Sequence, residues 1–249
     1  MDIALAALAL PPALAVGSFA NVVAARVPLR RSVNTPRSSC GSCGTEIMAR
    51  DNIPVVSWFL LRGHCRSCGA RISPLYPAVE ASTAALVVAC VLAFGATAYA
   101  ALASFFVVVL VTLTAADLRY RLVPNRIVIP AAVIVLLART AIDPSPEWLL
   151  SALAASGFLL LAALAYPKGL GMGDVKLALL LGAMLGVEVS VGLMVGFLAA
   201  LVPSISLLVR HGSRARKMAI PFVPFLAFGA VVALFAGEAL LDWYLGLTG

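Results

Sequence analysis

Residues 107–125 read VVVLVTLTAADLRYRLVPN, an apolar run that ends at Asp117 and continues into a short basic stretch. Extended back to residue 98, the run is long enough for an α-helix that crosses a hydrocarbon core of about 30 Å. It is continuous in Ala, Leu and Val instead of alternating, which excludes the strand of a membrane β-barrel. The stretch therefore predicts a membrane-spanning helix over 98–116 with an acidic residue at its end.

Apolar runs of this kind recur along the whole chain. Of its 249 residues 62% are hydrophobic and 12% charged, and the mean hydropathy is +1.04, far outside the range of soluble domains. The sequence predicts an all-α polytopic membrane protein with about eight transmembrane helices. Besides 98–116, the expected spans are 3–25, 77–95, 127–142, 148–166, 176–189, 190–209 and 224–245.

The net charge of +7 follows membrane topology. If the loop after the first span is cytoplasmic, 17 of the 18 lysines and arginines, all except Arg139, fall on the cytoplasmic side, as the positive-inside rule requires. Both termini are then expected outside. The basic excess thus does not indicate nucleic-acid binding, and Arg214, Arg216 and Lys217 are expected to contact anionic lipid headgroups.

The N-terminal run is expected to be a retained membrane helix. Asp2 stands where a signal peptide carries positive charge, and the basic cluster RVPLRR follows the apolar stretch. Pro11 and Pro12 are expected to bend or restart this helix.

Residues 26–76 form a polar insert between the first two spans. The insert contains CGSCG (Cys40, Cys43) and CRSCG (Cys65, Cys68), two C-x-x-C knuckles separated by 21 residues. This spacing is typical of a four-cysteine zinc site, in which the glycine after each knuckle helps the chain turn back. The sequence therefore predicts a small cytoplasmic, zinc-ribbon-like insert.

Two disulfides are the alternative, but thiols stay reduced in the cytosol. Four thiolates close the coordination shell, which favours a structural zinc over a hydrolytic one. His64 is either an additional ligand, a neighbour of the ligands or a solvated loop residue, and Cys90 is expected only to pack within the second span.

A second acid lies at the expected cytoplasmic start of the sixth span, in GMGDVK, where Asp174 precedes an apolar run. Two crossings separate it from Asp117, so both carboxylates are expected on the same membrane side. Two neighbouring carboxyls in a partly dehydrated site couple their titrations and share a proton. Such a pair suits peptide hydrolysis by water, whereas G-x-S-x-G and H-E-x-x-H are absent.

Structural roles for the same residues stay open. Asp117 could cap a helix end or pair with Arg119 or Arg121, and Asp174 could be an N-cap. Gly171 and Gly173 would permit a tight entry into the sixth span. Lys176 either extends its charge to the interface or tunes the aspartate pair.

At this point the chain resembles the prepilin peptidases, the type IV prepilin leader peptidase and N-methyltransferase family of GxGD aspartyl proteases. The resemblance rests on motifs in family order along almost the whole chain. They are GSFANVVAARVP from Gly17, the two knuckles, DNIPVVSWFLLRGHC from Asp51, ISPLYPAVE ending at Glu80, DLRYRLVPN from Asp117, GMGDVK from Gly171 and IPFVPFLAFG from Ile220.

The resemblance implies removal of a basic leader from type IV prepilin-like precursors at the cytoplasmic face of the bacterial inner membrane. Methylation of the new N-terminus by S-adenosylmethionine would follow. It implies Asp117 and Asp174 as catalytic residues and the four cysteines as metal ligands. It also implies Gly63 and Glu80 as methyltransferase residues. The expected regions are a first helix (1–25), the metal-binding insert (26–76) and a peptidase domain (77–249).

The sequence departs from the family at two places. The first knuckle lacks the proline that often follows the first cysteine, and Val223 stands where glycine is usual, which bears on substrate fit. Three other functions stay open. A peptidase without methyl transfer is one, because no G-x-G-x-x-G loop is present; the others are a proton-coupled transporter using the two acids and a zinc-stapled scaffold.

Overall fold

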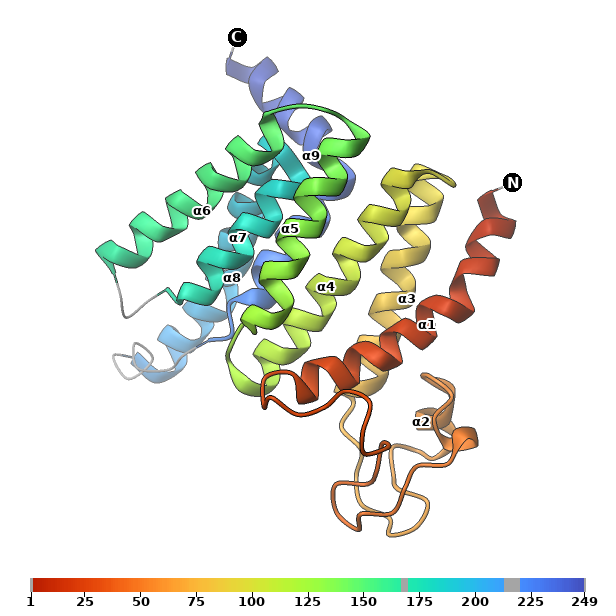
Figure 1. Cartoon of the computed structure of the whole chain (residues 1–249). Helices are drawn as coiled ribbons and strands as arrows, with labels where there is room; N and C mark the ends of the chain where they lie inside the picture. Colours follow the sequence, from red (N-terminus) through yellow and green to blue (C-terminus); the bar gives the residue numbers. More distant parts are fainter. Residues whose placement is uncertain (1, 167–169, 213–219, 249) are drawn as a thin grey trace. The chain divides into compact units, whose positions relative to one another are not determined.

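The computed structural model describes residues 2–166, 170–212 and 220–248, and its long elements are all helices (Figure 1). The long helices are α1 (Asp2–Arg26), α3 (Leu75–Phe94), α4 (Ala98–Tyr120), α5 (Asn125–Ile142), α6 (Glu147–Ala165), α7 (Met172–Leu185), α8 (Val189–His211) and α9 (Val223–Thr248). Shorter elements are η1 (Ala49–Asp51), α2 (Val56–Leu60) and η2 (Gly186–Glu188).

Seven stretches of the described chain are long and apolar enough to cross a membrane. One of them, Met172–Arg210, is interrupted by η2, so that it contains both α7 and α8. The expected all-α membrane fold, with seven or eight long apolar helices, is thereby confirmed.

The start of α7 differs from the sequence expectation. The helix begins at Met172 instead of residue 176, with Gly171 as its N-cap. Asp174 is consequently the third residue of the helix and not the N-cap itself. Hydropathy alone predicts too late a start because the first turn of α7 is polar. Hydrogen bonds stabilise this turn, and hydropathy does not reflect them.

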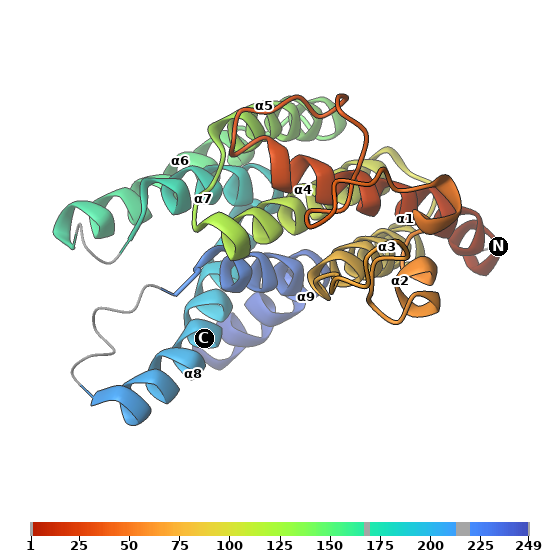
Figure 2. The same cartoon turned by 90° about the horizontal axis from the view of Figure 1, so that it is seen from below.

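The chain divides into two compact units, residues 1–115 and 116–249. In the first unit α1 and α3 lie side by side (Figure 2). Gly17 permits this close approach, since a Cβ there would lie 2.8 Å from the Glu80 Cα. Asn21 donates a hydrogen bond from Nδ2 to the carbonyl oxygen of Tyr76 at 3.0 Å. These contacts fix the start of α3 against the second half of α1.

Two expectations for this unit can be compared directly with the structure. Pro11 and Pro12 lie inside α1, which changes direction along its length instead of restarting (Figure 1). Cys90 is fully buried within α3, in agreement with a packing role.

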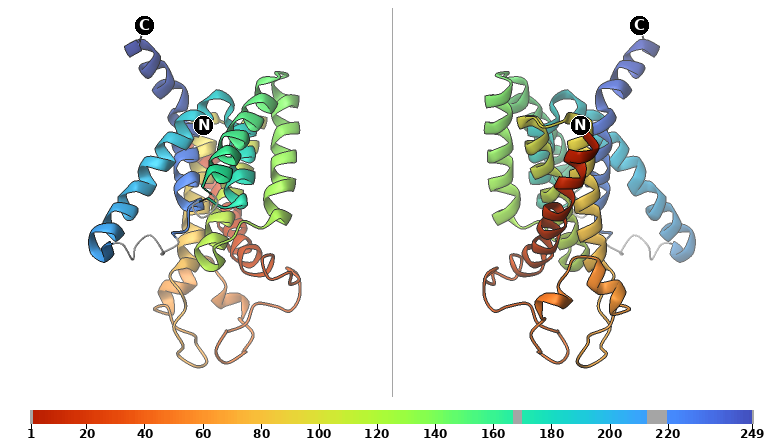
Figure 3. Two further views of the ribbon diagram at one scale, coloured as in Figure 1. Left: turned by 90° about the vertical axis from the view of Figure 1, so that its left-hand side faces the viewer. Right: turned by 90° about the vertical axis from the view of Figure 1, so that its right-hand side faces the viewer.

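In the second unit α7 packs against α5 and α6, and α8 packs against α9. Small residues make the second contact close: added Cβ atoms on Gly196 and Gly229 would collide with the facing helix backbone. The far part of α8 leans away from α5 and α6 (Figure 3).

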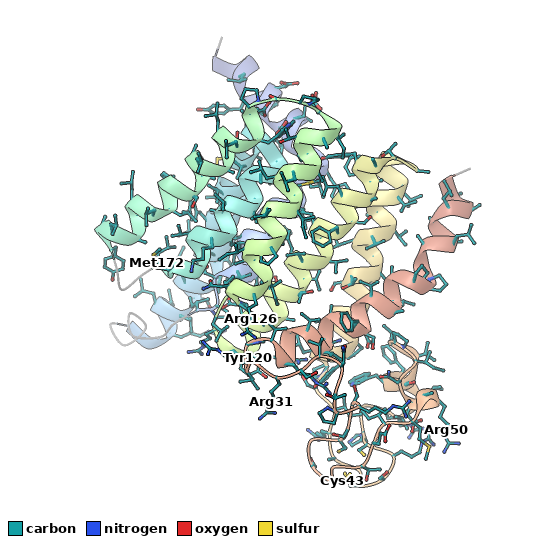
Figure 4. All side chains as sticks on the ribbon, viewed as in Figure 1. Arg31, Cys43, Arg50, Tyr120, Arg126 and Met172 are labelled. Carbon is teal, nitrogen blue, oxygen red and sulfur yellow. The ribbon has the colours of Figure 1, made fainter. Side chains whose placement is uncertain are left out.

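The end of α4 and the starts of α5 and α7 lie at one end of the second unit. Figure 4 labels one residue from each of these segments, Tyr120, Arg126 and Met172. The chain therefore brings Asp117 and Asp174 to the same end of this unit. Lys168 lies outside the described residues, and so do Arg214, Arg216 and Lys217 with their expected lipid contacts.

Candidate active site and metal centre

Asp117 lies in the last turn of α4, inside the helix instead of capping it. Only 5% of the residue is exposed. Its Oδ2 accepts a hydrogen bond from the backbone N–H of Val223, the first residue of α9, at 3.2 Å. The helix ends shortly afterwards, where Arg121 adopts a positive φ of 54°. Asp117 thus joins the end of α4 to the start of α9.

Asp174 is also buried, with 8% of the residue exposed. Its Oδ2 accepts a hydrogen bond from the N–H of Gly171 at 3.1 Å, and its own N–H donates to the Gly171 carbonyl oxygen at 3.0 Å. The carboxyl therefore satisfies one of the N–H groups that a helix start leaves without an intrahelical partner.

The two aspartates are electrostatic neighbours in the same unit. Each has Oδ2 held by a backbone N–H, which leaves Oδ1 as the other oxygen of each carboxyl group. Neighbouring carboxyls of this kind are expected to share a proton, as the sequence predicts. The arrangement can activate water with one carboxyl while the other donates a proton.

The glycines before Asp174 have different roles. A Cβ on Gly173 would lie 2.9 Å from Cβ and Cγ2 of Val123, in the segment that links α4 to α5. Gly171 has an ordinary φ of −84°, and a Cβ there would approach only Asp174 and the neighbouring backbone. The close approach thus depends on Gly173, whereas no backbone strain requires glycine at 171.

Gly173→Ala is expected to lower both the thermal stability of the protein and the hydrolytic activity expected of the aspartate pair. Displacing Val123 or the first turn of α7 costs about 1–3 kcal/mol by overpacking and moves the Asp174 backbone. Gly157→Ala is the matched control, because a Cβ on that α6 residue meets nothing within 4 Å. Thermal unfolding and cleavage rates of both variants check this. Wild-type values in Gly173→Ala would contradict the tight contact.

Lys176 does not contact either aspartate directly. Its Nζ donates a hydrogen bond to Oδ1 of Asn125, the first residue of α5, at 2.9 Å. The ammonium therefore ties the first turns of α5 and α7 together. This contact is different from the two roles expected for Lys176, and it positions the segment that carries Asp174.

An aromatic row approaches the backbone that holds Asp117. The rings of Phe197 (α8) and Phe222 are stacked, with centroids 5.8 Å apart, and Phe158 (α6) lies 6.4 Å from Phe197. Phe222 directly precedes Val223, whose N–H binds Asp117. The stacking therefore restrains the chain at the point where it donates to the carboxyl.

The metal-site prediction concerns four cysteines, and their sulfur atoms all lie within 4.8 Å of one another. Sγ of Cys40 and Sγ of Cys68 are 3.8 Å apart. Sulfur atoms at tetrahedral corners 2.3 Å from zinc are separated by about 3.8 Å. The cluster can bind a metal, and its geometry fits tetrahedral thiolate coordination.

The two knuckles are built alike. In each knuckle, the N–H of the first cysteine donates to the carbonyl oxygen of the residue five positions later in the sequence. The N–H of the glycine after the second cysteine donates to the carbonyl oxygen of the first cysteine. Gly44 and Gly69 have φ values of 72° and 70°, a conformation that glycine adopts without strain. These glycines make the turns expected from the sequence.

The surroundings favour the thiolate form in two of the cysteines. A hydrogen bond with the Thr45 hydroxyl, 3.3 Å from Sγ, is the main cause that lowers the pKa of Cys43 to about 6. Backbone N–H groups of Cys68 and Ser67 lower the pKa of Cys65. Thiolate is the form that binds metal. His64 is not part of the cluster: its Nδ1 lies 2.6 Å from the Arg62 carbonyl oxygen.

The expected methyltransferase residues lie in the first unit. Gly63 has a positive φ of 69°, and a Cβ there would lie 2.9 Å from the Trp58 ring. Glu80 is 8% exposed, and its Oε2 accepts a hydrogen bond from the N–H of Val55 at 2.7 Å. Both residues shape the part of the insert that contains α2.

The sequence does not predict several contacts of the site. Asn125 ends the motif DLRYRLVPN, so its presence was visible, but its bond with Lys176 was not. The sequence marks Val223 only as a departure in IPFVPF, although its backbone N–H donates to Asp117. Phe197 lies in no motif, and only the fold shows its contact with Phe222.

Both halves of the chain match known protein families. Residues 12–94 match the bacterial peptidase A24 N-terminal domain, and residues 104–209 match the type IV leader peptidase family. A prepilin leader peptidase/N-methyltransferase of Bacillus subtilis (strain 168) is 35% identical over 240 residues, covering 94% of this chain and 96% of that protein.

Proteins of the same name from two other bacteria are similar over most of their length. The protein of Aeromonas salmonicida (strain A449) is 34% identical over 93% of this chain and 91% of its own length. That of Burkholderia pseudomallei (strain K96243) is 32% identical over 98% and 88%. No solved structure matches the chain.

Proposed function

Because this chain belongs to the type IV leader peptidase family, we propose that it is a membrane aspartyl endopeptidase that removes the basic leader from type IV prepilin-like precursors. It then methylates the new N-terminal residue with S-adenosylmethionine. The observation that carries the peptidase activity is the pair of buried, electrostatically neighbouring carboxyls of Asp117 and Asp174.

The two aspartates divide the work of peptide hydrolysis. The ionised carboxylate takes a proton from a water molecule, which attacks the scissile carbonyl carbon, while the protonated carboxyl donates a hydrogen bond to the carbonyl oxygen. Proton transfer to the leaving amine then breaks the C–N bond. The N–H groups of Val223 and Gly171 hold Oδ2 of each aspartate and so orient the two carboxyls for the exchange.

The substrate class follows from the position of the pair. A prepilin-like precursor joins a basic leader to an apolar helix. The aspartate carboxyls lie at the ends of apolar helices, at the edge of the bilayer. There they can hydrolyse the peptide bond between the basic leader and the apolar helix of the substrate. The basic loops expected on the same side support a site at the cytoplasmic face of the bacterial inner membrane.

The four cysteines hold a structural zinc ion in the cytoplasmic insert. Four thiolates fill a tetrahedral shell and leave no position for a reactive water, so the metal stabilises the insert and takes no part in cleavage. An insert of residues 26–76 has little apolar core of its own, and metal binding supplies folding energy that the core lacks. Residues 77–249 form the peptidase domain.

Methyl transfer is assigned to the first helix and the insert, with Gly63 and Glu80 as its residues. S-adenosylmethionine supplies the methyl group to the free amine that cleavage creates. The motifs that surround Gly63 and Glu80 support this assignment, together with the shared contact of both residues with the α2 region.

Glu80→Ala is expected to reduce methyl transfer by about tenfold or more while leader cleavage continues, because loss of the carboxylate releases the Val55 N–H. Glu46→Ala is the control, since the Glu46 carboxylate forms a surface ion pair with Arg37. The Arg37 side chain is 85% exposed. Labelled methyl incorporation measures the effect. Equal methyl transfer in Glu80→Ala and wild type would show that Glu80 has no role in methyl transfer.

Purified protein in lipid nanodiscs, incubated with a prepilin-like precursor and S-adenosylmethionine, tests the whole proposal. Mass spectrometry is expected to find the precursor without its leader and with one added methyl group. A shortened but unmethylated product would leave the peptidase alone. An intact precursor would contradict the proposed function.

A further inference from the structure

The short helix α2 exposes large apolar side chains although it is not one of the membrane spans. The exposed fractions are 49% for Ile53, 48% for Val56, 65% for Phe59 and 75% for Leu60. These four residues form the α2 patch. Several large apolar side chains exposed within one short segment mark a surface that contacts a protein or a membrane.

The opposite side of α2 is fixed to the insert, so the patch cannot turn inward. Ser57 is buried, and its Oγ donates to the Arg50 carbonyl oxygen at 3.1 Å. Trp58 donates from Nε1 to the carbonyl oxygen of Ile72 at 3.2 Å and lies against Gly63. The outward direction of Phe59 and Leu60 is therefore built into the fold.

The depth of α2 is set by its bond to α3. The N–H of Val55, directly before α2, donates to Oε2 of Glu80 at 2.7 Å. Glu80 lies about 7.5 Å along the helix axis from Leu75, at 1.5 Å per residue, and helical side chains lean toward the N-terminus. This places α2 beside the first turns of α3, as Figure 1 shows. The apolar span of α3 begins at the same level.

Two further features favour the bilayer as the surface that covers the patch. The neighbouring spans are exposed at this level, through Phe19 of α1 and Tyr76 of α3, which are 52% and 41% exposed. Exposed apolar side chains of both spans and of α2 thus occur at one level of this unit. Arg50 and Arg62, which precede and follow the patch in the sequence, are exposed. Their charge complements anionic lipid headgroups.

We propose that α2 is an interfacial element of the insert. Ile53, Val56, Phe59 and Leu60 enter the boundary between headgroups and acyl chains, and the flanking arginines contact the headgroups. Together with the bond between Val55 and Glu80, this contact holds the metal-binding insert at the membrane surface beside α3. The inference does not depend on the proposed enzymatic activity.

Photocrosslinking in the full-length protein tests the proposal. The photoreactive residue p-benzoylphenylalanine is placed at Phe59, and separately at Ser42, an exposed knuckle residue next to Cys43. Figure 4 labels Cys43 at the far end of the insert from α3. The protein is reconstituted in nanodiscs that contain phosphatidylglycerol and phosphatidylethanolamine, irradiated, and analysed for lipid adducts by mass spectrometry.

Lipid adducts are expected at position 59 with a yield roughly tenfold above that at position 42, because an interfacial side chain lies several ångströms inside the headgroup layer. Metal content and α-helical circular dichroism of both proteins verify that the insert is folded. A lipid yield at position 59 no higher than at position 42 would overturn the proposal. Adducts at position 59 to polypeptide instead of lipid would do the same.

Discussion

Replacing either Asp117 or Asp174 with asparagine is expected to reduce leader cleavage by about two to four orders of magnitude, the contribution typical of a general acid or base. An amide neither takes a proton from water nor passes one to the leaving amine. Its carbonyl oxygen, however, still accepts the hydrogen bond from Val223 or Gly171 that each carboxyl accepts. The fold is thus retained while the chemistry is lost.

Asp143→Asn is the matched control, because Asp143 is exposed after α5, at the other end of that helix from Asn125. Initial rates of precursor cleavage, with circular dichroism of each variant, make the comparison. Cleavage within tenfold of wild type in Asp117→Asn or Asp174→Asn would show that the pair is not the catalytic centre.

Cys65→Ser is expected to abolish stoichiometric metal binding and to unfold the insert. Structural zinc contributes about 10–16 kcal/mol to the folding of small zinc-finger peptides, so its loss exceeds what the insert can compensate. Removal of the metal by a chelator should have the same result. Metal analysis and limited proteolysis between residues 26 and 76 measure it.

Cys90→Ser is the control for this substitution. Cys90 is buried within α3, outside the four-cysteine cluster, so its variant should keep the metal and a protease-resistant insert. One bound zinc per chain in Cys65→Ser, with an unchanged proteolysis pattern, would contradict the assignment of the four cysteines.

The helices and the four-cysteine cluster could be predicted because each depends on a short, continuous sequence pattern. A span needs an apolar run of suitable length, and a zinc knuckle needs two cysteines at fixed spacing followed by glycine. The positions of α3, α5 and α6 agree with the expected spans to within about two residues, the usual uncertainty of helix ends.

The supports of the aspartates could not be predicted in the same way. Asp117 binds the backbone of Val223, more than 100 residues later, and any residue other than proline offers that N–H. The hydrogen bond between Glu80 and Val55 likewise joins two segments that lie 25 residues apart and belong to different motifs. Such contacts depend on packing between distant segments, which hydropathy does not encode.

The most direct test of the two proposed activities uses one variant and two substrates. Asp174→Ala and wild-type protein are each given an intact prepilin-like precursor and, separately, a pre-cleaved substrate, with labelled S-adenosylmethionine present. The expected result is that Asp174→Ala does not cleave the precursor but labels the pre-cleaved substrate as wild type does. Cleavage of the precursor by Asp174→Ala would contradict catalysis by the aspartate pair.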